Sequence, residues 1–121
     1  MFPEAISSPS PTPSPEIQVN ELAQRLQSAR PPTVVEVLGP QYFAGGHLPG
    51  ALNLPLAGFN ENALLLLPDK AGEVVVYCAS SGCQNSDIAA RQLHTLGYSN
   101  IRVFKGGKAA WRDAGYPLLT A

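Results

Sequence analysis

Two cysteines lie close together in a short segment of small and polar residues. The segment CASSGCQNS runs from Cys78 to Ser86 and follows the apolar run Val-Val-Val-Tyr at residues 74–77. A thiol at the end of a strand can act as a nucleophile when loop N–H groups and a helix N-terminus stabilise its thiolate. From these residues alone, three other interpretations stay open: a disulfide, a metal site, and a buried thiol without chemistry.

The segments around the cysteines alternate between apolar runs and helical patterns. The runs expected to form strands span residues 33–38, 51–54, 73–78 and 101–104. Helices are expected after the cap Asn20, across residues 41–44 and 64–67, from the cap Ser86 to the stop at Gly97, and across residues 108–114. This alternation predicts an α/β fold with a parallel sheet and helices on both faces. Such sheets bind ligands beyond the carboxyl ends of their strands, which is where Cys78 is expected.

The composition favours one domain with a buried core. The chain has 121 residues, of which 45% are hydrophobic and 14% charged. Residues 1–16 are rich in Pro and Ser and are expected to be a disordered arm, which leaves residues 17–121 as the domain. The net charge of −1 and the scattered basic residues argue against binding to nucleic acid or to a membrane. No apolar run reaches the roughly 20 residues of a membrane span. No signal-peptide pattern stands at the N-terminus, so we expect a cytoplasmic protein.

Three longer segments resemble the rhodanese family: VVEVLGPQYFAGGHLPGALNLPL, VVVYCAS and AARQLHTLGYSNIRVFKGGKAAWRDAGYPL. The resemblance covers residues 17–119. Its most specific parts are residues 46–51, the Tyr77-Cys78 strand end, and Gly106-Gly107 followed by Trp111. It implies a rhodanese-like α/β fold whose central parallel sheet has about five strands, with helices on both faces.

The resemblance also implies a sulfurtransferase. In the family, the loop cysteine attacks the outer sulfur of a donor such as thiosulfate and carries it as a persulfide, which loop amides hold. Carried over to this chain, Cys78 is the nucleophile, and the acceptor is a thiol such as thioredoxin, glutathione or a protein thiol. The implied substrate-binding residues are Ala79, Ser80, Ser81, Gly82, Gln84, Asn85 and Ser86. We expect no cofactor.

Two arginines of the family pattern are absent. Asn85 stands where the family loop has an arginine before the helix, and Leu38 stands at the arginine of an Asp-x-Arg pattern near a strand end. One charge-assisted hydrogen bond contributes roughly 1.5–3 kcal/mol, so we expect weak use of thiosulfate. Phosphatase chemistry is disfavoured more strongly, because it needs a guanidinium on the phosphate dianion.

Cys83 is an addition to the family loop. If the loop brings the two thiols together, Cys83 can attack the sulfur of a Cys78 persulfide, release hydrosulfide and leave a disulfide. It can also condense with a Cys78 sulfenic acid, so that Cys83 acts as a resolving thiol. The alternative is a small apolar residue packed under the loop. Zinc is disfavoured and we expect no metal, because His47 and His94 are the only histidines in the chain and there is no second pair of cysteines.

Other residues near these motifs have a structural and a functional interpretation. Lys105 and Lys108 either supply part of the missing positive charge or are solvated lysines. We expect His47 to order its loop through backbone hydrogen bonds, and Trp111 to pack in the core. Glu36 is expected to accept hydrogen bonds from loop amides.

The leading hypothesis is sulfur transfer through a persulfide on Cys78. One rival is a non-catalytic binding or regulatory module, since the arginines are missing. The other is a thiol–disulfide redox protein that uses Cys78 and Cys83. The enzymatic hypothesis requires main-chain dipoles that keep the Cys78 sulfur ionised and reachable.

Overall fold

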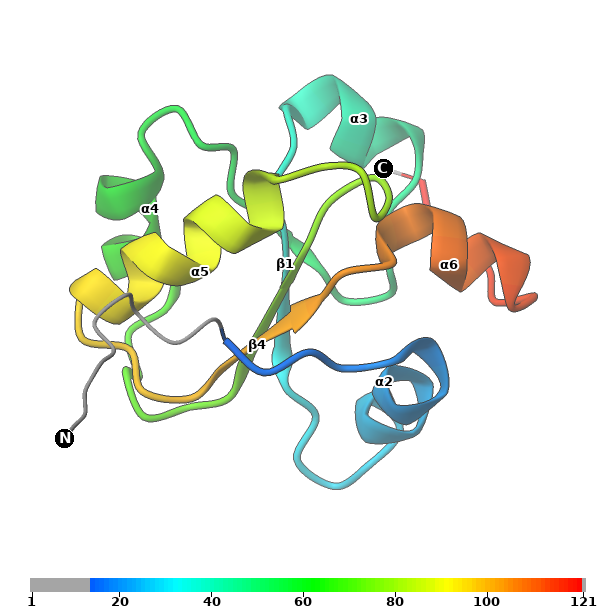
Figure 1. Ribbon diagram of the computed structural model, residues 1–121, viewed down its shortest axis with the longest axis horizontal. Coiled ribbons are helices and arrows are strands. Elements are labelled where there is room, and N and C mark those ends of the chain that lie inside the picture. The colour runs from blue at the N-terminus through cyan, green and yellow to red at the C-terminus, as the bar shows by residue number, and fades with distance from the viewer. Residues whose placement is uncertain (1–13, 121) are drawn as a thin grey trace, which may run out of the picture.

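A computed structural model describes residues 14–120 and shows a parallel β-sheet between two layers of helices (Figure 1). The strands are β1 (Thr33–Glu36), β2 (Leu52–Asn53), β3 (Val74–Tyr77) and β4 (Ile101–Phe104). Their order across the sheet is β2-β1-β3-β4, and every neighbouring pair is parallel. The pairing aligns Glu36 with Tyr77 and Tyr77 with Phe104, so the carboxyl ends of β1, β3 and β4 lie at one edge of the sheet.

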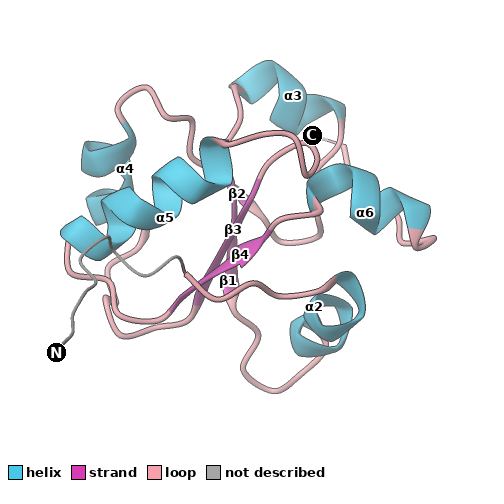
Figure 2. Ribbon diagram, in the orientation of Figure 1, coloured by secondary structure: helices cyan, strands magenta, loops and turns pink. Residues whose placement is uncertain are grey.

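Helices cover both faces of this sheet (Figure 2). They are α2 (Val19–Leu26), α3 (Pro40–Gly45), α4 (Phe59–Leu66), α5 (Asn85–Thr95) and α6 (Gly107–Asp113). One face packs against α4 and α5, and the opposite face packs against α2 and α6. None of the helices within residues 14–120 is long and apolar enough to cross a bilayer.

Alternation along the strands builds the two halves of the core. In β3, Val74 and Val76 face the α4–α5 layer, whereas Val75 and Tyr77 face the α2–α6 layer. All four side chains are buried. Side chains of a strand alternate between faces, so a continuous apolar run is what a doubly covered parallel strand requires.

The expected α/β architecture, with a parallel sheet and helices on both faces, is confirmed. The described residues form four strands where we expected about five, and three of the strands are shorter than the apolar runs that predicted them. The run at 101–104 matches β4. Residues 1–13 of the expected arm lie outside the described residues. Glu16, placed in the arm by the sequence, forms a parallel bridge with Val103 of β4, so the ordered chain begins before Ile17.

The two predicted helix caps are wrong. Helix α2 begins at Val19 after Gln18, and α5 begins at Asn85 after Gln84, so Asn20 and Ser86 both lie inside helices. Ser86 is fully buried, and its hydroxyl lies 3.7 Å from the Cys78 sulfur. Its side chain therefore contacts the thiol and does not cap the helix amides.

Candidate active site

The cysteine loop lies at the edge of the sheet where the strands end, as the sequence predicts. Strand β3 leads directly into Cys78, and residues 79–84 connect it to α5. Two hydrogen bonds fix the loop, one to the segment after β1 and one within the loop itself. The Asn85 side chain donates to the carbonyl of Val37 just beyond β1 (3.0 Å), and the Cys83 N–H donates to the carbonyl of Ser80 (3.0 Å). The loop is thus a closed turn fixed to the neighbouring strand.

Cys78 is the buried thiol of the pair, at 1% exposure. Its Sγ–H donates to the carbonyl of Cys83 (3.5 Å) and lies beside the Ser86 hydroxyl. Burial raises the pKa of the Cys78 thiol, and the hydrogen bond to the Cys83 sulfur raises it further. The N–H of Ser86 acts in the opposite direction without reversing the shift. The expectation that the loop lowers the pKa of this thiol is therefore wrong, because desolvation outweighs the nearby main-chain dipole.

Cys83 is partly exposed and has the more acidic thiol. Burial by itself would raise its pKa. The hydrogen bond from Cys78 and those from the N–H groups of Asn85 and Ala79 outweigh that effect, and the charge of Lys105 adds to them, so the pKa of Cys83 is lowered. Both cysteines are free, and they lie within hydrogen-bonding reach of each other. The proximity that a resolving thiol needs is present.

Some of the predicted substrate-binding residues contact the two cysteine sulfurs, and others line a hollow on the outer side of the loop. Ala79, Asn85 and Ser86 direct main-chain N–H groups at the two sulfurs. Ser80 closes the turn through its carbonyl. A hollow of about 510 Å³ opens on the outer side of the loop. Its lining consists of Ser81, Gly82, Gln84, Asp87, Arg91 and Lys105.

The first turn of α6 holds the start of the loop, a role that the sequence did not predict. The N–H of Lys108 donates to the carbonyl of Cys78 (3.1 Å), and that of Ala109 donates to the carbonyl of Ala79 (3.0 Å). This close approach needs Gly107, which has a φ of +61° and lies against the Cys78 carbonyl. The Gly-Gly pair was the available signal, because such a pair marks a close backbone approach as well as a turn.

Glu36 and Lys108 form a buried ion pair beneath the loop. Glu36 is fully buried and accepts a hydrogen bond from the Tyr77 hydroxyl (2.7 Å). The Nζ of Lys108 lies 2.9 Å from Glu36 Oε2 and donates to the carbonyl of Tyr42 (2.8 Å). Two expectations are corrected here: the partners of Glu36 are a phenol and an ammonium, where we expected loop amides, and Lys108 is not a solvated lysine. Burial of the carboxylate is tolerated because both of its oxygens face a donor or a cation.

A second hollow, of about 350 Å³, lies on the other side of the loop. It is lined by Leu38, Gln41, Tyr42, Gly45, Gly46, Ala79, Lys108, Arg112 and Leu118. It contains the position of one absent family arginine, Leu38, next to the loop residue Ala79. Two cations, Lys108 and Arg112, therefore stand near the place where that arginine would be.

The structure confirms the expected roles of two aromatic residues. Nδ1 of His47 donates to the carbonyl of Phe43 (3.0 Å), and the two rings stack with centroids 4.0 Å apart. The main chain of His47 also pairs with Leu119. Trp111 is buried in the α2–α6 half of the core, and its Nε1–H donates to the carbonyl of Pro117 (2.9 Å).

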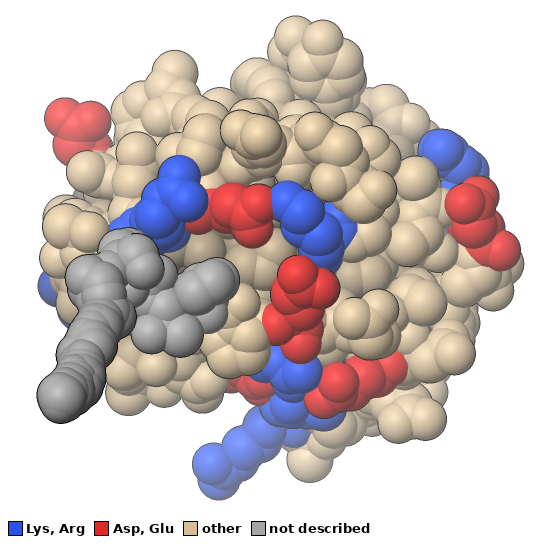
Figure 3. Space-filling view, in the orientation of Figure 1, with Lys and Arg blue, Asp and Glu red and all other residues tan. Residues whose placement is uncertain are grey.

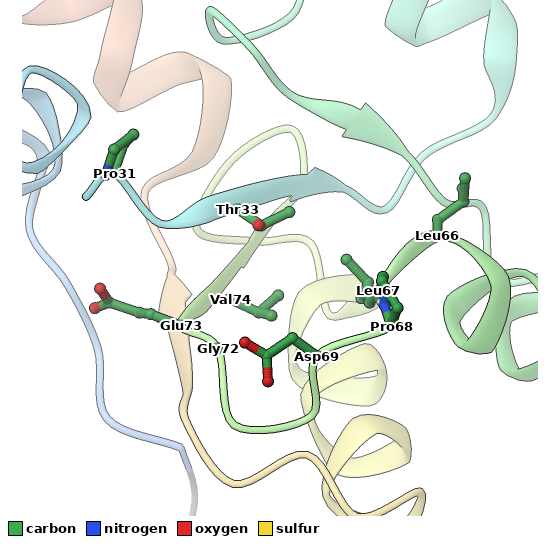
Figure 4. Close-up of a pocket in the computed structure, with 9 residues that line it drawn as sticks. All are labelled: Pro31, Thr33, Leu66, Leu67, Pro68, Asp69, Gly72, Glu73 and Val74. Atoms are coloured by element: carbon green, nitrogen blue, oxygen red, sulfur yellow. The ribbon is translucent and has the colours of Figure 1, made fainter. Parts of the chain in front are cut away.

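Another hollow, of about 200 Å³, lies at the opposite end of the sheet, where β1 and β3 begin (Figure 4). Its lining combines apolar side chains, a hydroxyl and two carboxylates: Pro31, Thr33, Leu66, Leu67, Pro68, Asp69, Gly72, Glu73 and Val74. Glu73 forms an ion pair with Arg25. Because the strands run away from this hollow toward Cys78, it is separate from the cysteine loop.

Some of the surface charges form ion pairs. Acidic and basic side chains alternate across the face shown in Figure 3. Ion pairs join Lys105 to Asp87 and Arg102 to Glu21. Across residues 14–120, no group of three or more His, Cys, Asp or Glu residues is placed to hold a metal ion.

Comparisons with known proteins agree with the expected rhodanese-like fold. A family profile described as the Rhodanese-like domain matches residues 18–114. Thiosulfate sulfurtransferase GlpE of Pseudomonas putida is 38% identical over 104 residues, covering 84% of this chain and 87% of that protein. The uncharacterized protein slr1261 of Synechocystis sp. is 36% identical over 97 residues, covering 79% of this chain and 51% of that protein. This chain thus spans about half the length of that relative. The crystal structure of the Alr3790 protein from Anabaena sp. superposes with a TM-score of 0.79 at 28% identity, covering 86% of this chain and 91% of that one.

Proposed function

Because this chain belongs to the rhodanese-like domain family, we propose that it is a sulfurtransferase that stores a sulfane sulfur as a persulfide on Cys78. The donor is thiosulfate or a similar small sulfane-sulfur compound. The acceptor is a thiol such as thioredoxin, glutathione or a protein thiol.

One observation carries this proposal: three main-chain N–H groups of the loop are directed at the two cysteine sulfurs. The N–H of Ser86 faces Cys78, and those of Ala79 and Asn85 face Cys83. A persulfide carries a terminal negative sulfur that needs donors, and oriented amides supply them without a side-chain cation. The arrangement suits a loop that lacks the family arginine.

The chemistry balances without a further oxidant. A loop thiolate attacks the outer sulfur of thiosulfate, the new S–S bond forms, and sulfite leaves with the electron pair of the broken S–S bond. The acceptor thiolate then attacks the outer sulfur of the loop persulfide, and the loop cysteine leaves as a thiolate. Each turnover moves one neutral sulfur atom and regenerates the loop.

Intact-mass analysis tests the proposal. After incubation with thiosulfate, and separately with mercaptopyruvate, the wild-type chain should gain the mass of one sulfur. Peptide mapping should find it on Cys78, and dithiothreitol should remove it. A Cys78→Ser/Cys83→Ser double variant is the control and should gain nothing. A non-catalytic binding module would show no adduct in the wild-type chain with either donor.

The proximity of two free thiols favours thiol–disulfide redox chemistry as a second candidate. Hydrogen peroxide would oxidise one of the two thiols to a sulfenic acid, and the other thiol would displace water to form the disulfide. This candidate predicts a reversible loss of two hydrogen masses after mild peroxide treatment. The loss should be absent in Cys83→Ser, and no persulfide should form with any sulfur donor.

A further inference from the structure

The two thiols of the loop differ in access to solvent. Cys78 is 1% exposed, beneath the Cys83 carbonyl and the Ser86 hydroxyl. Cys83 lies in the same loop and is partly exposed. A sulfur donor diffusing in from solvent therefore meets Cys83 first.

Most of the hydrogen bonds that favour a thiolate converge on Cys83. The Cys83 sulfur faces the N–H groups of Ala79 and Asn85, which lie at the two ends of the loop, and it also faces the thiol of Cys78. The N–H of Cys83 is bonded to the Ser80 carbonyl, which fixes its main chain in the turn. The position that loop amides would offer to an incoming sulfur is thus occupied by the Cys83 sulfur.

A hollow with a positive balance of charge is lined by the two residues that flank Cys83, although Cys83 itself is not part of its lining. It is formed partly by Gly82 and Gln84, the neighbours of Cys83 on either side, and partly by charged residues of α5 and the segment after β4. The charged groups that line it are Arg91, Lys105 and Asp87, of which Lys105 and Asp87 are paired. Two cations against one carboxylate suit a small anionic donor such as thiosulfate.

Building on the proposed sulfurtransferase function, we propose that Cys83 is the thiol that first attacks the donor and that it passes the sulfane sulfur inward to Cys78. In the first step, the Cys83 thiolate bonds to the outer sulfur of thiosulfate, and sulfite leaves with the electron pair. In the second step, the Cys78 sulfur bonds to that outer sulfur, and the S–S bond to Cys83 breaks. The proton of the Cys78 thiol moves to the departing Cys83 thiolate, so atoms and charges balance.

The two-step route explains how a buried residue is loaded. A direct attack by Cys78 would require the donor to displace the Cys83 main chain, whose carbonyl accepts the Cys78 thiol. An inward transfer requires only exchange between two thiols that already contact each other. Cys78 then stores the persulfide away from solvent, and return through Cys83 delivers the sulfur to the acceptor.

Single variants test the order of attack. With thiosulfate as the donor, Cys78→Ser should gain one sulfur on Cys83 at about the wild-type rate. Cys83→Ser and Cys83→Ala should load at least about tenfold more slowly, because the exposed thiolate is gone. Loading of either Cys83 variant at the wild-type rate overturns the proposal, and so does a folded Cys78→Ser chain that takes up no sulfur. If the wild-type chain itself stays unloaded with thiosulfate, mercaptopyruvate and inorganic polysulfide, the proposed function fails instead.

Lysine variants test the hollow as the donor site. Lys105→Gln should slow thiosulfate loading of Cys83 by roughly threefold or more, because one of two cations facing the donor is lost. Raising the salt concentration should reduce this difference. Lys70→Gln is the matched control, since Lys70 contacts the carbonyl of Leu96 at the other end of α5. Equal loading rates in the two lysine variants would remove the hollow from the proposal.

Discussion

Gly107 lies so close to Cys78 that a Cβ added at residue 107 would stand 2.3 Å from the Cys78 carbonyl oxygen. The contact is with the main chain, which cannot rotate away as a side chain would. Through it, α6 donates its Lys108 N–H to the residue that bears the buried thiol. The position of the candidate nucleophile therefore depends on a glycine about thirty residues away in sequence.

We predict that Gly107→Ala destabilises the fold by at least about 2 kcal/mol. A positive φ costs a non-glycine residue about 1–2 kcal/mol, and the clash with the carbonyl adds to this. Urea denaturation should show a lower midpoint with an unchanged slope. Gly82→Ala is the control, because its added Cβ meets nothing within 4 Å and its φ is not in the left-handed region. Equal midpoints for the two variants would mean that the backbone around residue 107 relaxes without cost.

Lys108→Met should be much more destabilising than Lys105→Met. Removal of Lys108 leaves the fully buried Glu36 carboxylate without its cation, which costs about 3–5 kcal/mol. The partner of Lys105 is Asp87, a partly exposed carboxylate, and surface pairs contribute about 0–1 kcal/mol. Chemical denaturation of both variants provides the comparison.

The double variant Glu36→Gln/Lys108→Met separates the charge from the packing. It should recover part of the stability lost in Lys108→Met, because no buried charge then remains. A double variant that is less stable than Lys108→Met would show that the aliphatic stem of Lys108, and not its charge, supports this region.

The architecture was predictable because its signals are local. The run of apolar residues before Cys78 indicates a doubly covered strand, and β3 has both faces buried. The stop at Gly97 predicted the end of α5, which the structure bears out, since α5 ends at Thr95 and Gly97 has a positive φ. Helix starts were less predictable. Serine is a preferred residue type for a helix cap, yet the Ser86 hydroxyl lies beside the Cys78 thiol and does not cap α5.

The site was only partly predictable because its properties come from contacts between distant segments. The sequence places Cys78 at the strand end, but its burial depends on the path of the loop, and burial reverses the expected direction of its pKa shift. The pairing of Lys108 with Glu36 joins residues far apart in sequence, so neither could be assigned a partner beforehand. Asn85 likewise holds the Val37 carbonyl, a structural role that its place in the family pattern did not indicate.

Leu38→Arg should load thiosulfate at about the same rate as Leu38→Gln. Leu38 lines the hollow on the Ala79 side of the loop, whereas the proposed donor site is the outer hollow formed partly by Gly82 and Gln84. A guanidinium facing the donor would add a charge-assisted hydrogen bond of roughly 1.5–3 kcal/mol and raise the loading rate per molar thiosulfate about tenfold or more. Leu38→Gln is the uncharged control of similar length. A gain specific to Leu38→Arg would show that donors approach the loop from the side of residue 38.

The reactivity of the two thiols toward iodoacetamide should separate with pH. The rate of alkylation follows the thiolate fraction of each cysteine. Because the pKa of Cys83 is lowered, Cys83 should react below the usual cysteine range near pH 8.5. Because the pKa of Cys78 is raised, Cys78 should react only at higher pH. Peptide mass spectrometry of samples alkylated across a pH series measures both profiles in one chain. In Cys78→Ala, the pKa of Cys83 should rise toward the ordinary value, because the hydrogen bond from Cys78 that lowers it is removed. Equal profiles for the two cysteines in the wild-type chain would contradict the assignment of the acidic thiol to Cys83.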